Sequence, residues 1–172
     1  MKNLKRVLSV CLFVVLFFVS CGYQFEGGGY LKDDVMHVAV EALENKSSET
    51  GAGITFTNAL IQEILQKTDT KVVDESRATA VLKGTVRSIT FTTLSRASTE
   101  SVIERKVFAT VDLKLINKDD DAVIWSVKDF KSDDEYTVSA DTITDESNKK
   151  EAVDRIAARS AEKLVGKMLV NF

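Results

Sequence analysis

Cysteine and histidine are scarce in this 172-residue chain, which has two cysteines and one histidine. Cys11 lies in an N-terminal segment that we expect to be removed, so Cys21 would remain alone and no intramolecular disulfide could form. No Cys/His spacing fits a metal site. His37 lies on the polar side of an expected strand, where a surface residue is more typical than a catalytic one. We therefore expect no enzyme, no metal and no cofactor apart from a covalent lipid, and a domain held together by its core.

An excess of basic charge is also missing. The chain has 23 basic and 26 acidic residues. Removal of residues 1–20 would take away three basic residues and no acidic one, which leaves a formal charge of −6. A nucleic-acid-binding surface needs basic groups for the phosphates. This balance therefore argues against a nucleic-acid partner, although it is compatible with a local basic patch.

The N-terminus has the pattern of a secretory signal. Three basic residues precede the apolar segment 7–19, which is too short to span a bilayer comfortably. The tetrapeptide Val19-Ser20-Cys21-Gly22 resembles a lipobox, although Phe18 stands where leucine is usual. We expect cleavage before Cys21 and acylation of that cysteine by palmitate or similar chains, of which two or more give stable anchoring. The alternatives are an ordinary signal peptide and an uncleaved anchor helix.

The residues around Cys21 also predict location and domain organisation. Gly22, rather than aspartate, follows the cysteine, which by the usual sorting pattern favours the periplasmic side of the outer membrane. Three successive glycines at 27–29 indicate a flexible leader. We therefore expect a signal peptide at 1–20, a lipidated leader at 21–33 and a single domain at 34–172.

Hydrophobic periodicity predicts the elements of that domain. Strands are expected at 36–43 and 80–94, with a short strand at 71–73, and a hairpin is expected from 107–115 and 123–127. A change of buried parity within 80–94 requires a bulge near Arg87 and Ser88. A helix of roughly four turns should bury two adjoining apolar rows, and a C-terminal helix should start near residue 147 or 148. The two rows are Ile54, Ile61, Leu65 and Phe56, Leu60, Ile64.

This order predicts an α+β fold, a two-layer sandwich with a mixed four-stranded sheet and two helices packed on one face, in the order β-α-β-β-β-α. Neither helix can bury its apolar stripe alone, and the sheet offers one face for both. The expected core contains Leu60, Ile64, Val111, Leu113, Trp125, Ile156 and Leu164.

Two kinds of charged cluster are candidate sites. The acidic runs 119–121 and 133–135 lack the glycine and the spaced glutamate of a calcium loop, so solvated turns are the favoured interpretation. Four basic residues bracket the loop 95–101 and would gather at one tip of the sheet if the flanking strands pair. They could bind phosphate groups, or they could be a scattered, solvated set. These residues are Arg87, Arg96, Arg105 and Lys106.

Several segments, taken in order, resemble the LptE family of LPS-assembly lipoproteins. They are Cys21-Gly22-Tyr23-Gln24-Phe25 with its glycine-rich spacer, a strand ending at Asn45, a helix carrying Thr57-Asn58-Ala59-Leu60, the segment 78–86, and Val123-Ile124-Trp125. The similarity covers essentially the whole expected mature chain. The family often has proline after the leader and at the end of the first strand, whereas this chain has no proline. The chain therefore resembles a divergent member.

The resemblance implies a small α/β lipoprotein that is tethered to the outer membrane, plugs the LptD β-barrel and helps deliver lipopolysaccharide to the cell surface. A barrel lumen is polar, which suits a folded plug with a mainly polar exterior. The implied partners are thus an LptD-type barrel, lipopolysaccharide and, through the anchor, the membrane. The alternative is a free-standing, periplasm-facing lipoprotein that binds a soluble or cell-wall ligand or another envelope complex.

Overall fold

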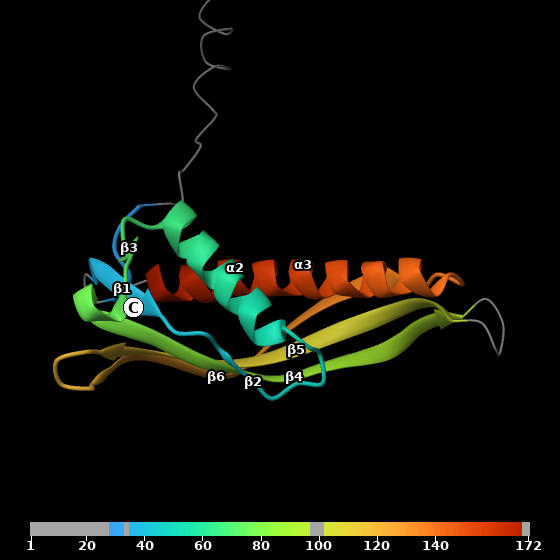
Figure 1. The fold of residues 1–172 in the computed structure, drawn as a ribbon, viewed down its shortest axis with the longest axis horizontal. Coiled ribbons are helices and arrows are strands. Elements are labelled where there is room, and N and C mark those ends of the chain that lie inside the picture. The colour runs from blue at the N-terminus through green and yellow to red at the C-terminus, as the bar shows by residue number, and fades with distance from the viewer. Residues whose placement is uncertain (1–27, 33–34, 97–101, 170–172) are drawn as a thin grey trace, which may run out of the picture.

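A computed structural model describes residues 28–32, 35–96 and 102–169. The expected signal peptide, Cys21 and most of the loop 95–101 lie outside the described residues. The elements are β1 (His37–Val40), β2 (Glu44–Asn45), α2 (Ala52–Lys67), β3 (Lys71–Val72), the 3-10 turn η2 (Glu75–Arg77), β4 (Ala80–Arg96), β5 (Val102–Asn117), β6 (Val123–Thr137) and α3 (Thr142–Leu169). Both helices lie on the same side of the sheet, and α2 crosses α3 obliquely (Figure 1).

The strands form one mixed sheet in the order β3-β1-β4-β5-β6, with β2 pairing separately with β4. The short strands β1, β2 and β3 pair in parallel, and the three long strands pair antiparallel. The predicted α+β class is confirmed, but the predicted count of four strands is wrong, since the sheet has six. Of the two strands beyond the predicted four, β3 lies within the short strand expected at 71–73, and β2 has only two residues, too few to produce a periodic pattern.

The bulge predicted in the second long segment is present. The pairing of β4 with β5 shifts between Val86 and Ser88, so that Val86 opposes Val111 and Ser88 opposes Thr110. The shift keeps both Val86 and Ile89 buried, at 0% and 3% exposure. It also leaves Arg87 as the extra residue on the face of the sheet away from the helices, which we call the outer face.

Three elements are clearly longer than their apolar patterns predict. β5 runs over Val102–Asn117 instead of 107–115. β6 continues from Val127 to Thr137. Its second half lacks an apolar pattern, because two of its three buried residues, Ser132 and Asp134, are polar and only Tyr136 belongs to the core. α3 begins at Thr142, before the predicted start at 147 or 148. Its first turns are mostly polar and contain no buried residue, and its buried stripe begins only at Ala152.

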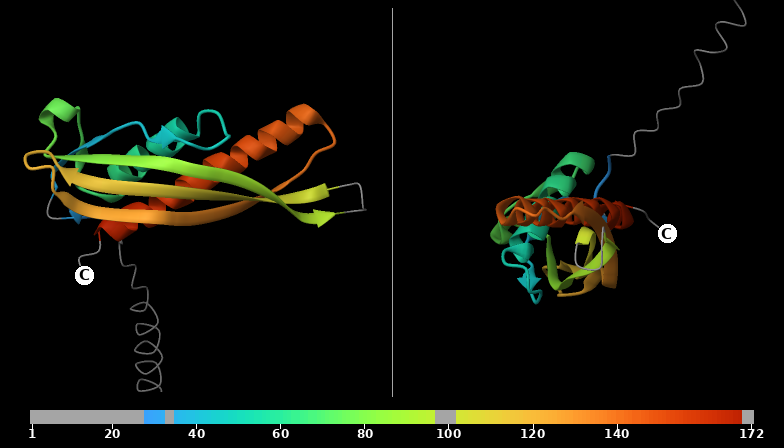
Figure 2. Two further views of the ribbon diagram at one scale, coloured as in Figure 1. Left: turned by 90° about the horizontal axis from the view of Figure 1, so that it is seen from below. Right: turned by 90° about the vertical axis from the view of Figure 1, so that its right-hand side faces the viewer.

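The core lies between the helices and the inner face of the sheet. Six of the seven predicted core residues are at most 2% exposed, whereas Trp125 lies at the margin and is only partly buried. In α2 the row Phe56, Leu60, Ile64 is buried as predicted. The prediction is wrong for the adjoining row, because Ile54 and Leu65 are 56% and 58% exposed. Figure 2 shows α2 lying across α3. The buried residues of α2 include Phe56, Leu60 and Ile64, so the helix is covered on that side and the adjoining row stays outside the core.

Within the described residues, no helix combines the length and the apolar character that a membrane span requires.

Candidate functional site

The structure separates Arg87 from the other three predicted basic residues. Arg96 ends β4 at the tip of the β4–β5 hairpin, opposite Val102, while Arg105 and Lys106 oppose Thr93 and Thr92. These three cations therefore lie within about 13 Å of each other along the strands. Arg87 lies nine residues from Arg96, or about 30 Å along β4. Its guanidinium pairs with the carboxylates of Asp112 at 3.2 Å and Asp129 at 3.7 Å.

Arg105 and Lys106 point to opposite faces of the sheet. On the outer face, Nζ of Lys106 lies 2.8 Å from Asp133 and 3.5 Å from Glu135, and 5.7 Å from the centre of the Phe108 ring. The hydrogen bond to Asp133 raises the pKa of Lys106 and lowers that of Asp133. On the inner face, Nη1 of Arg105 donates to the hydroxyl of Tyr136 at 3.5 Å, and this bond raises the pKa of Arg105.

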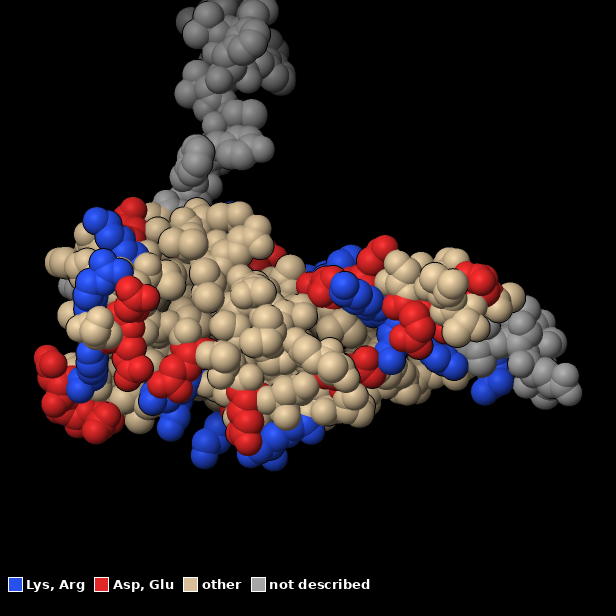
Figure 3. All heavy atoms as spheres, in the orientation of Figure 1, with Lys and Arg blue, Asp and Glu red and all other residues tan. Residues whose placement is uncertain are grey.

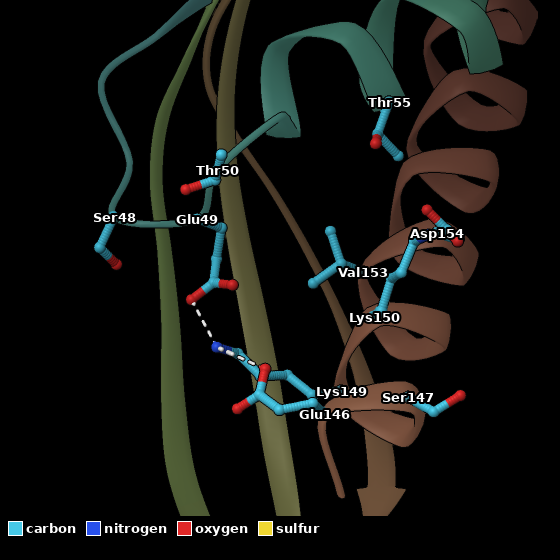
Figure 4. Close-up of a pocket in the computed structure, with 10 residues that line it drawn as sticks. All are labelled: Ser48, Glu49, Thr50, Thr55, Glu146, Ser147, Lys149, Lys150, Val153 and Asp154. Carbon is cyan, nitrogen blue, oxygen red and sulfur yellow. Dashed lines mark ion pairs between the residues drawn. The ribbon is translucent and has the colours of Figure 1, made fainter. Parts of the chain in front are cut away.

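The helix side of this end of the sheet carries a hollow of about 560 Å³ between α3 and the loop that joins β2 to α2 (Figure 4). Lys149 stands in its wall, with Nζ 3.0 Å from Glu49, 4.0 Å from Glu146 and 5.0 Å from the Phe91 ring centre. Burial opposes the positive charge of Lys149, but the hydrogen bond and charge of Glu49 outweigh it and raise the pKa. The ion pair thus ties the loop before α2 to α3.

A second ion-pair group holds α3 to the edge strand β6. The buried carboxylate of Asp134 accepts a hydrogen bond from Nε of Arg155 at 2.6 Å, and its other oxygen lies 2.9 Å from Nη1 of Arg159. Both guanidinium groups also donate to main-chain carbonyls of β6, those of Glu135 and Asp133. The structure therefore corrects the interpretation of 133–135 as a solvated turn, since these residues form part of a strand.

Sequence reasoning missed Lys149 and the Asp134 group. A signal for Lys149 was present, because it lies three and four residues before Ala152 and Val153 on the apolar side of α3, where a charge requires a partner. No comparable signal marks Asp134, because its partners lie 21 and 25 positions further along the chain.

The remaining candidates carry no site. His37 is half-buried at the start of β1, and the run 119–121 is an exposed turn after β5. Among the residues that the structure describes, no group of three or more His, Cys, Asp or Glu side chains could hold a metal ion.

A family model described as lipopolysaccharide-assembly, LptE, matches residues 35–168 of the chain. No curated protein matches it in sequence. Among solved structures, the chain resembles an uncharacterized lipoprotein B from Nitrosomonas europaea with a TM-score of 0.57 and 14% identity, covering 83% of this chain and 84% of that one. A DUF330 protein from Xanthomonas campestris gives 0.53 and 15%, covering 83% and 90%. At these identities the structural likeness shows the fold alone.

Proposed function

Because the chain belongs to the LptE lipopolysaccharide-assembly family, we propose that it is a non-catalytic outer-membrane lipoprotein that plugs an LptD-type β-barrel and assists the transport of lipopolysaccharide to the cell surface. The observation that carries this proposal is the family match itself, which runs from just before β1 almost to the end of α3. If the proposal holds, depletion of the protein should reduce newly made lipopolysaccharide at the cell surface. Unchanged surface delivery after complete depletion would contradict it.

The proposed anchor is a lipid on Cys21. The lipobox-like Val19-Ser20-Cys21 supports it, and Gly22 supports the outer membrane as the destination. Cys21→Ala should yield a slower-migrating precursor or a mislocalised form. Mass spectrometry of the wild-type N-terminal peptide should show an acylated cysteine, and an unmodified one would exclude the anchor.

The arrangement of the domain is compatible with a plug that extends away from its anchor. The described chain begins beside the end of α2, where Gly28 N–H donates to the carbonyl of Lys67 at 3.2 Å. The hairpin of β4 and β5 reaches to the opposite end of the molecule (Figure 1). β4 has 17 residues and spans about 55 Å. A lipid at one end would thus leave the hairpin tip far from the tethering point.

The tip is the proposed contact for lipopolysaccharide, because its anionic phosphates bind cationic side chains. Arg96, Arg105 and Lys106 supply them, and Arg87 is too distant to join the same contact. Replacing these three tip residues by glutamine should weaken lipopolysaccharide binding and flatten its salt dependence. The matched control is Arg87→Gln, which removes one charge from the middle of the sheet and should leave binding unchanged. Wild-type affinity of the triple variant at low salt would show that the tip is not the contact.

A further inference from the structure

The exposed side of α2 carries an apolar row that no described part of the chain covers. Ile54 and Leu65 are 56% and 58% exposed, and Ile61 between them is half-buried. The spacing places all three on one side of the helix, along about 17 Å of its length. The buried row Phe56, Leu60, Ile64 already joins α2 to the core. The exposed row is therefore not needed to attach α2 to the core.

The same side of α2 is almost without charge. From Ala52 to Gln66 the one charged residue is Glu63, and the polar residues beside the apolar row are the amides Asn58, Gln62 and Gln66. α3 differs sharply, since charged side chains follow its exposed side from Glu146 to Lys167. Figure 3 shows an uncharged expanse in the upper middle of this face, with charged groups at both ends and along the lower edge. Depletion of charge marks the centre of protein–protein interfaces.

The start of the described chain places this surface near the proposed anchor. Gly29 N–H donates to the carboxylate of Asp69 at 2.7 Å, and Asp69 N–H donates back to the carbonyl of Gly29 at 2.9 Å. Gly29 therefore lies beside the C-terminal end of α2. Cys21 lies seven positions before Gly28, a reach of at most about 25 Å. A partner of α2 must then lie at or close to the membrane that holds the lipid.

We infer that Ile54, Asn58, Ile61, Gln62 and Leu65 form the surface of this protein that packs against the inner wall of the barrel. This inference rests on the proposed function. A barrel wall presents polar side chains on its inner side, which suits a helix face that mixes apolar residues with amides and lacks charge. A lipid surface fits less well, because helices that lie in the membrane interface carry lysine and arginine along the polar face. α2 has one basic residue, Lys67, at its very end.

Site-specific photo-crosslinking in cells that make the full chain and its barrel tests the inference. Asn58 and Gln62 are exposed and take no part in the core, so each can be replaced by p-benzoylphenylalanine without removing a buried group. Two control positions are exposed on other surfaces, Lys114 on the outer face and Glu162 on α3. We expect adducts with the barrel from positions 58 and 62 at yields at least fivefold above those from 114 and 162.

A paired substitution provides a second readout. Ile54→Ser with Leu65→Gln should leave the thermal midpoint within a few degrees of wild type, and should reduce the barrel recovered with the protein at least fivefold. Any of three results would overturn the inference. The control positions could crosslink to the barrel as strongly as positions 58 and 62 or more strongly, positions 58 and 62 could give adducts with lipid instead of protein, or they could give no adduct while the wild type still binds the barrel. If the wild type itself recovers no barrel, the proposed function fails and the inference fails with it.

Discussion

Asp134 of the edge strand β6 and Arg155 of α3 are joined by a hydrogen bond of 2.6 Å between the carboxylate and Nε. The side chain of Asp134 is only 9% exposed, and Arg159 pairs with its second carboxylate oxygen at 2.9 Å. A buried carboxylate at this position requires both arginines, and both lie on the side of α3 that faces β6. The pair therefore fixes where the long helix lies on the sheet.

Asp134→Asn should destabilise the fold by about 2 to 4 kcal/mol, because it removes a charge around which two guanidinium groups are arranged. The neighbouring change Asp133→Asn is the matched control. Asp133 is exposed and pairs with Lys106 on the outer face, so its loss should cost less than about 1 kcal/mol. Urea denaturation of both variants would measure the difference. Equal losses would show that the Asp134 group does not hold α3.

Leu60→Ala and Leu65→Ala test the orientation of α2. Leu60 is 1% exposed and Leu65 is 58% exposed. The buried truncation should cost about 2 to 5 kcal/mol, and the exposed one should stay within about 0.5 kcal/mol. Denaturant midpoints give both values, and a loss at Leu65 as large as that at Leu60 would mean that α2 is rotated from the described position.

Replacement of two helical glycines by alanine should change the stability of the fold in opposite directions. A Cβ at Gly53 would collide with the main-chain carbonyl of Leu43, whereas a Cβ at Gly166 meets no atom within 4 Å. Gly53→Ala should therefore destabilise by about 1 to 3 kcal/mol. Gly166→Ala should stabilise by up to about 1 kcal/mol, because alanine loses less entropy in a helix. Thermal midpoints that move in the same direction would contradict the close approach of α2 to the segment after β1.

Lys149→Met should cost about 1 kcal/mol at neutral pH, since it leaves Glu49 without its partner. The pKa of Lys149 is raised in the folded state above the ordinary value of 10.5. The stabilisation is therefore fully present below pH 10.5 and is lost as the pH rises through the raised pKa. Unfolding free energies of wild type and variant should differ by a constant amount from pH 7 to pH 9 and converge in stronger base. A difference that grows with rising pH would contradict the assignment.

Elements with a periodic pattern of apolar residues could be predicted from the sequence. Features that depend on contacts between residues far apart in the chain could not. The parity change in β4 predicted its bulge, because both sets of apolar residues had to be buried on the same face. The second half of β6 gave no such pattern, because Asp134 is buried by arginines that follow it much later in the chain. Periodicity also counted Ile54 and Leu65 as core, since it shows that a residue is apolar but not whether another layer covers it.

The basic cluster shows the same limit. The hairpin that brings Arg96, Arg105 and Lys106 to one tip follows from the strand pattern. The opposite directions of Arg105 and Lys106 follow from the alternation of side chains along a strand. The distance of Arg87 from the tip follows equally from strand length. The buried partner of Arg105, Tyr136, depends on the unpredicted extension of β6 to Thr137.

The most direct test of the central claim is affinity isolation of the tagged, full-length protein from detergent-solubilised outer membranes, followed by mass spectrometry and limited proteolysis. The account predicts that an LptD-type β-barrel is recovered in about equal amount and that it protects the domain from protease. The plug would be contradicted if the protein were recovered alone, or with a soluble or cell-wall ligand, and if protease cleaved its domain. That result would favour a free-standing lipoprotein.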